Sequence, residues 1–278
     1  MPAFDQLAGW PAPLAATGVT DAHATIADAG DVDLVQPWAS VTKMVTAYGV
    51  LRLVEVGDID LAEAAGPPGS TVRHLLAHAS GLNMDGDAVI APPGRRRIYS
   101  NAGFRLLGTL VAERTGRAVG DYLATAVFEP LGMTASTVDG DAAAGGSGPV
   151  RDLLSFGREL LQPTLIGPET HELATSVVFP GLDGVLPGFG RCNPNDWGLG
   201  FELRDGKDPH WTGRDNSPET FGHFGQQGSF LWVDSSIGLA CAALTSVAFG
   251  AWAAQAWPPF SDAVVAEFGL RATGPRRP

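Results

Sequence analysis

The sequence predicts an α+β fold in which a body built from both ends of the chain carries an inserted helical region. Helical periodicity dominates residues 40–162, whereas glycine, tryptophan and β-prone runs follow Pro187. We expect the body to comprise residues 1–60 and 187–278, and the helical region residues 61–186. The 278 residues, of which 45% are hydrophobic, can bury a sizeable core as one large domain or two joined ones.

The N-terminal part predicts a strand followed by a buried helix. Weak alternation in TGVTDAHATIADAG, residues 17–30, predicts a strand that ends in a turn. Apolar residues then recur at helical spacing and predict a helix that begins near Ser40: Val41, Met44, Val45, Tyr48, Leu51 and Val54. A proline and glycine break at residues 65–69 follows this helix.

Four helical patterns and then three strand-like runs occupy the rest of the chain. The helical patterns are TVRHLLAHA (71–79), AGFRLLGTLVAERTG (102–116), VGDYLATAVF (119–128) and VRDLLSFGRELLQ (150–162). The strand-like runs are WGLGFELRD (197–205), TFGHFGQQGSFLWVD (220–234) and GLACAALTSV (238–247), before a last helix at WPPFSDAVVAEFG (257–269).

Composition excludes several classes of partner. A net charge of -12 argues against nucleic acids and anionic membranes, which need concentrated basic charge. The uncharged residues 237–260 contain glycines, hydroxyls and Pro258-Pro259, which favour a buried strand passing into a helix over a membrane span. The two cysteines form no disulfide framework, and no signal peptide precedes the first strand, so we expect a cytoplasmic protein.

Ser40 and Lys43 form the first chemical motif. The chain contains only two lysines, so a lysine three residues after a serine is unusual here. Residues i and i+3 share one face of a helix, so the Lys43 amine can reach the Ser40 hydroxyl. Burial can lower the pKa of a lysine and make it a base, which arginine cannot become. S-x-x-K alone is a weak signal, because a capping serine and a surface lysine give the same pattern.

Two further motifs follow. Tyr99 and Asn101 offer a phenol and an amide: with its pKa lowered by Lys43, Tyr99 is a candidate base or proton shuttle, and Asn101 can hold a substrate carbonyl. A packing tyrosine and a helix cap are the structural alternatives. Glycines at 222, 225 and 228 then interrupt a strand, so that a ligand can approach its backbone. His223 faces the site in this interpretation, and the Gln226 N–H can complete an oxyanion hole with that of Ser40.

These motifs, in this order, resemble the serine hydrolase group of class C β-lactamases, D,D-peptidases and family VIII esterases. The stretches TVRHLLAHASGL, PGRRRIYSNAGFRLLGTLVAERTG and VFEPLGM are also similar to that group, and the resemblance covers residues 35–135 and 197–247. It implies a β-lactamase/transpeptidase-like fold, with an antiparallel sheet flanked by helices and an inserted all-helical region.

The resemblance also implies roles for single residues. Ser40 becomes the acyl-enzyme nucleophile, and Lys43 and Tyr99 share the proton transfers, with the division between them left open. Asn101 contacts the substrate, and His223, Phe224 and Gly225 stand where relatives carry K-T-G, H-T-G or W-G-G. Phe224 replaces a threonine that grips a substrate carboxylate in penicillin-recognising relatives, and His223 replaces a permanent positive charge.

We therefore expect a serine hydrolase, and first a carboxylesterase acting on a small ester. A β-lactamase, D,D-peptidase or amidase acting on lactams or amides is the second interpretation. An acylated sensor without turnover is the third. We expect no metal or cofactor: His74 and His78 lie four residues apart, but HLLAH lacks the glutamate of a zinc-protease motif. Acyl group, leaving group and oligomeric state are left open by the sequence.

Overall fold

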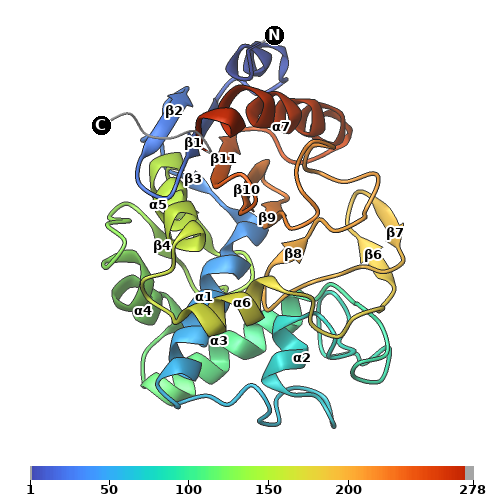
Figure 1. The fold of residues 1–278 in the computed structure, drawn as a ribbon. Coiled ribbons are helices and arrows are strands. Elements are labelled where there is room, and N and C mark those ends of the chain that lie inside the picture. Colours follow the sequence, from blue (N-terminus) through green and yellow to red (C-terminus); the bar gives the residue numbers. More distant parts are fainter. Residues whose placement is uncertain (1, 273–278) are drawn as a thin grey trace.

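A computed structural model describes residues 2–272 and centres on a six-stranded antiparallel sheet (Figure 1). The strand order is β2-β1-β11-β10-β9-β8. Both ends of the chain supply this sheet, as the sequence predicted. The strands are β1 (Ala15–Thr20), β2 (Thr25–Ala29), β8 (Glu202–Leu203), β9 (Phe221–Gly225), β10 (Ser229–Asp234) and β11 (Leu239–Thr245).

Helices cover both faces of the sheet. Leu231 and Val233 of β10 belong to a core shared with helix α5 (Val150–Leu161), whereas Phe230 and Trp232 pack in a second core with helix α7 (Ala251–Ala272). Successive side chains of a strand point to opposite faces, so β10 and β11 are buried at every residue. This double cover explains their continuous apolar runs.

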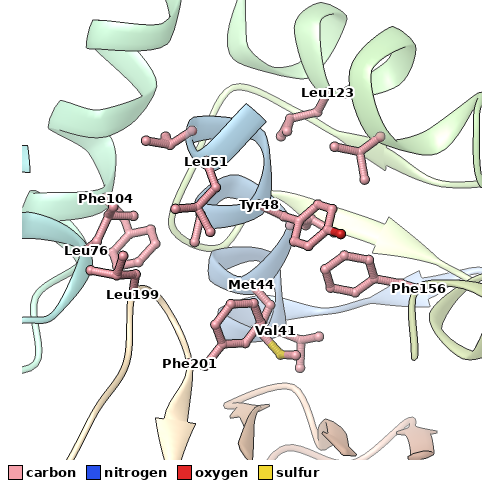
Figure 2. Close-up of a cluster of buried hydrophobic side chains, with 14 of the residues drawn as sticks. Val41, Met44, Tyr48, Leu51, Leu76, Phe104, Leu123, Phe156, Leu199 and Phe201 are labelled. Carbon is pink, nitrogen blue, oxygen red and sulfur yellow. The ribbon is translucent and has the colours of Figure 1, made fainter. Parts of the chain in front are cut away.

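Helix α1 (Thr42–Glu55) runs through the middle of the molecule (Figure 1). A short 3-10 helix, η2 (Ala39–Val41), leads into it. Met44, Tyr48 and Leu51 project from α1 in different directions, and side chains from the helical region and from the sheet surround them (Figure 2). Every residue from Thr42 to Leu51 is buried, so protein encloses this part of the helix on all sides. Lys43, on the same helix, is consequently buried.

The remaining elements lie around this centre. They are η1 (Phe4–Gly9), α2 (Val72–Leu76), α3 (Asn101–Thr115), α4 (Val119–Leu123), η3 (Ala124–Phe128) and α6 (Pro168–Thr175). Two small antiparallel sheets complete the fold. Their strands are β3 (Gln36–Pro37), β4 (Thr137–Val138) and β5 (Gly146–Gly148) in one, and β6 (Gly184–Leu186) and β7 (Gly190–Cys192) in the other.

The structure departs from the sequence predictions at several elements. Residues 17–30 contribute to two paired strands rather than one. The helix expected over 71–79 is only α2, because His78 adopts a left-handed φ of 53° that ends it. Helix α6 was not predicted, and α7 begins at Ala251 and continues through Pro258 and Pro259. Helix α5 lies inside the range expected for the helical region, yet it packs on the sheet.

The uncharged stretch from Ile237 divides into β11 and the start of α7, as predicted. Within residues 2–272, no helix combines the length and the apolarity that crossing a membrane requires.

Candidate active site

Ser40 lies at the entrance to α1, on a tightly constrained piece of backbone. Ala39 before it has a φ of 46°, a left-handed conformation that is unusual for a residue with a Cβ. The start of β10 holds this segment: Ser229 Oγ donates to the Trp38 carbonyl at 2.7 Å. A Cβ on Gly225 would lie 2.3 Å from the same carbonyl oxygen, so only glycine permits β9 to approach Ser40 this closely.

Lys43 lies one turn after Ser40 and has three oxygen neighbours. Its Nζ is 3.1 Å from Ser40 Oγ, 2.7 Å from Asn101 Oδ1 and 3.0 Å from the Ala143 carbonyl oxygen. The amide and carbonyl oxygens can only accept, so they take two N–H groups. In the neutral amine, the lone pair is then left for the Ser40 hydroxyl.

The neutral amine is accessible near neutral pH. Burial lowers the pKa of Lys43 from 10.5 to about 7, although the more distant Asp141 carboxylate opposes this. Lys43 is fully buried, and none of the ion pairs within residues 2–272 includes it. Burial is therefore the main cause of the lowered lysine pKa, as the role of Lys43 as a base requires.

Tyr99 approaches the same serine oxygen from the other side. Its phenol donates to Ser40 Oγ at 2.6 Å, and Lys43 Nζ lies 4.8 Å from the centre of its ring. Burial raises the pKa of Tyr99 above its ordinary value. The expectation that Lys43 lowers the pKa of Tyr99 is wrong, because burial of the phenol raises its pKa more than the hydrogen bond to Ser40 lowers it. Tyr99 keeps its proton and serves as a donor.

Asn101 begins helix α3 and links Lys43 to a charged surface group. Its Oδ1 accepts from Lys43, and its Nδ2 donates to Asp85 Oδ1 at 3.2 Å. Asp85 also accepts from Arg105 Nη1 at 2.9 Å. These partners fix the orientation of the amide. The helix cap itself is Ser100, whose Oγ accepts from the Gly103 N–H.

His78 holds the segment of Tyr99 and Ser100 in place. Its Nδ1 accepts from the Ser100 N–H at 3.1 Å, and its ring lies 4.7 Å from that of Tyr99. His74 instead hydrogen bonds to Thr71. Within residues 2–272, no group of three or more His, Cys, Asp or Glu side chains is arranged to hold a metal ion.

Strand β9 supplies the wall opposite Tyr99. His223 is 4% exposed, and its ring centre lies 5.8 Å from that of Tyr99. The next residue, Phe224, packs against Phe249 and Trp257 in the core beneath α7. Gln226, exposed in the turn that follows β9, completes the wall.

These residues line a cavity of about 180 Å³. Its apolar lining consists of Met84, Leu186, Pro187, Trp197 and Phe224. Its polar lining consists of Ser40, Tyr99, Asn101, Glu202, His223 and Gln226, with neither lysine nor arginine among them. The cavity therefore brings together most of the predicted site residues, with Lys43 buried behind Ser40 and Gly225 against the backbone of Trp38.

Sequence reasoning missed Glu202. This carboxylate is 2% exposed, and it accepts from His210 Nε2 at 2.8 Å and from Trp211 Nε1 at 2.9 Å, while Lys207 pairs with its other oxygen. Burial alone raises the pKa of Glu202, but His210 and Lys207 together lower it to about 2. His210 and Trp211 do not line the cavity themselves, and they support a carboxylate that does. The available signal for Glu202 was Lys207, the second of only two lysines in the chain, which pairs with this carboxylate.

Comparison with known proteins places the chain in a family. The family model for β-lactamases matches residues 9–266. The chain belongs to the β-lactamase family. The β-lactamase/transpeptidase-like fold that the motifs predicted is thereby confirmed, and the chain is a serine hydrolase of that family.

Individual relatives span several activities. A β-lactamase from Mycobacterium bovis is 51% identical, with a TM-score of 0.95 over 96% of this chain and 100% of that one. A simvastatin synthase from Aspergillus terreus shares the fold at 18% identity, with a TM-score of 0.80 over 96% of this chain and 94% of that one. Penicillin-binding protein 4* of Bacillus subtilis is 29% identical over an alignment of 133 residues, with coverage of 36% of this chain and 30% of that protein.

Proposed function

We propose that this protein is a carboxylesterase that hydrolyses small, uncharged esters through an acyl-enzyme on Ser40. The observation that carries the proposal is the cavity in front of Ser40, which is largely apolar and lined by neither lysine nor arginine. Substrates with a carboxylate beside the scissile bond need a cation or hydroxyl donors there. A neutral ester needs only apolar contact and an activated serine.

Acylation begins with neutral Lys43. As Ser40 Oγ attacks the ester carbonyl, its proton passes to Lys43 Nζ, 3.1 Å away. The N–H groups of Ser40 and Gln226 receive the developing oxyanion. Asn101 and the Ala143 carbonyl keep the amine aimed at Ser40 throughout.

Tyr99 then supplies the proton that the departing alkoxide needs. Its hydroxyl already donates to Ser40 Oγ. In the tetrahedral intermediate, Ser40 Oγ and the departing alcohol oxygen are bonded to the same carbon, so the phenol lies close to both. The alcohol departs with the phenol proton, and the Lys43 ammonium returns the serine proton to the phenolate. A water molecule hydrolyses the acyl-enzyme by the reverse sequence of transfers.

A β-lactamase activity is the second candidate. The 51% identity to the β-lactamase from Mycobacterium bovis favours it. Nitrocefin and p-nitrophenyl butyrate separate the two: we expect rapid turnover of the butyrate and slow turnover of nitrocefin. The reverse order overturns the esterase assignment.

The nucleophile is tested separately by covalent labelling. A fluorophosphonate probe should label the wild-type protein and not Ser40→Ala, with circular dichroism as the control for folding. Labelling that survives the substitution contradicts the acyl-enzyme on Ser40. Labelling of the wild type without hydrolysis of either substrate identifies a protein that is acylated and not turned over.

A further inference from the structure

The imidazole of His223 is held in one tautomer. Its Nδ1 lies 2.6 Å from the carbonyl oxygen of Phe224, which can only accept a hydrogen bond. Nδ1 therefore carries the proton. In the neutral ring, Nε2 is then a bare acceptor.

This acceptor has no partner among residues 2–272. Within residues 2–272, Nε2 of His223 is buried and receives no hydrogen bond. His223 nevertheless lines the cavity in front of Ser40. A buried acceptor without a donor costs free energy, and a ligand that brings a donor removes this cost.

The surrounding charges do not suit an anionic ligand. The cavity lining contains neither lysine nor arginine, and Glu202 contributes a carboxylate. The Lys207 ammonium is already bound to Glu202 and to two backbone carbonyls. Burial, together with the nearby Lys43, lowers the pKa of His223 to about 3, so the ring stays neutral in the physiological range. A substrate carboxylate placed beside His223 would face the lone pair of Nε2, which repels it.

We propose that His223 Nε2 accepts a hydrogen bond from the substrate, so that the preferred esters carry a hydroxyl or amide N–H near the scissile bond and no carboxylate there. This inference rests on the proposed esterase function and names its substrate class. In a largely apolar cavity, a hydroxyl is ordinarily disfavoured against a methyl of the same size. A preference for the hydroxyl therefore requires a specific acceptor.

Matched esters test the proposal on both sides of the scissile bond. On the alcohol side, 2-hydroxyethyl butyrate is compared with propyl butyrate, its near-isostere, and with carboxymethyl butyrate. On the acyl side, p-nitrophenyl 3-hydroxybutyrate is compared with p-nitrophenyl 3-methylbutyrate. We expect kcat/KM to favour the hydroxyl compound about tenfold on one side, and to be lowest for the carboxylate.

His223→Leu removes the acceptor and retains an apolar side chain. In this variant the ratio between hydroxyl compound and isostere should fall to about one or below, whatever the absolute rates. The matched control is His74→Leu, which changes a histidine on α2 that does not line the cavity and should leave the ratios unaltered. If His223→Leu does not fold, the kcat/KM ratios between hydroxyl compound and isostere in the wild-type protein decide the proposal by themselves.

The outcomes separate this proposal from the esterase function. Hydrolysis of propyl butyrate without a hydroxyl preference on either side, or a preference for carboxymethyl butyrate, overturns the role of His223 and leaves the esterase standing. A hydroxyl preference that survives in His223→Leu assigns the acceptor elsewhere and also overturns it. Failure to hydrolyse any of these esters overturns both.

Discussion

Replacing Lys43 with methionine should stabilise the protein while abolishing its activity. The folded state holds this amine at a pKa of about 7 against 10.5 in the unfolded chain. That difference of about 3.5 pKa units corresponds to about 5 kcal/mol of lost stability at and below pH 7. Methionine keeps the apolar stem and removes this penalty.

The stability gained in Lys43→Met is smaller than the full cost of burying the Lys43 amine. Asn101 Oδ1 and the Ala143 carbonyl lose their donor in Lys43→Met, at about 1 to 1.5 kcal/mol each. The net stabilisation is therefore about 2 to 3 kcal/mol near pH 6. Substitutions that stabilise a protein and abolish its activity are common where the active site contains an uncompensated polar group.

The pH dependence provides the sharper signature. Between pH 7 and 10.5 the unfolded lysine binds a proton that the folded one does not, so wild-type stability from this group rises with pH. The advantage of Lys43→Met should therefore shrink by about 1.4 kcal/mol for each pH unit above 7. Urea denaturation of both proteins at pH 6, 7, 8 and 9 measures this difference directly.

Lys207→Met is the matched control. Lys207 is also buried, but it pairs with Glu202, so its removal leaves a buried carboxylate without its ammonium partner. We expect a loss of about 3 to 5 kcal/mol rather than a gain. If Lys43→Met is instead less stable than the wild type at pH 6, with a difference that does not change with pH, the assignment of a strained, neutralised lysine is refuted.

Activity provides the remaining predictions. The kcat/KM for p-nitrophenyl butyrate should rise with pH through a limb near pH 7, since only neutral Lys43 accepts the serine proton; a pH-independent profile from 5 to 9 contradicts this. Lys43→Arg should lose almost all acylation by a fluorophosphonate with the fold retained, and an active variant excludes lysine as the base. Tyr99→Phe should lower kcat about 10²- to 10⁴-fold with little change in melting temperature, and an unchanged kcat removes the phenol from proton transfer. Gly225→Ala should lower both the melting temperature and kcat, because its Cβ meets the Trp38 carbonyl; wild-type values for both refute the close approach.

The three motifs were predictable because each is local. A serine and a lysine three residues apart share a helix face wherever that helix lies, and glycines in a strand mark a close approach wherever the strand pairs. Their convergence on one oxygen was not visible locally. Ser40 and Tyr99 are 59 positions apart in the sequence, and tertiary packing brings them together, including the contact of His78 with Ser100. The resemblance to a known family supplied that step.

The failures have a different origin. The direction in which the pKa of Tyr99 shifts depends on how much water reaches the phenol. No pattern in the sequence reports the burial of a single side chain. Likewise, Glu202 was missed because its partners are scattered along the chain: Trp211, which is 1% exposed, donates to it from nine residues away. Helix α6 is short and only Ala174 in it is buried, so it carries little apolar periodicity to detect.

The two buried lysines show how the same side chain acquires opposite properties from its neighbours. Lys207 meets a carboxylate and two carbonyl groups, so burial is compensated by an ion pair and the residue supports the cavity wall. Lys43 meets an amide oxygen, a carbonyl and a hydroxyl, none of which carries a charge, so burial is compensated only by losing the proton. A carboxylate within hydrogen-bonding distance of Lys43 would restore the ammonium and remove the base. Within residues 2–272, no carboxylate forms such an ion pair with Lys43, although the chain contains thirty acidic residues, and the proposed chemistry depends most on this feature of the site.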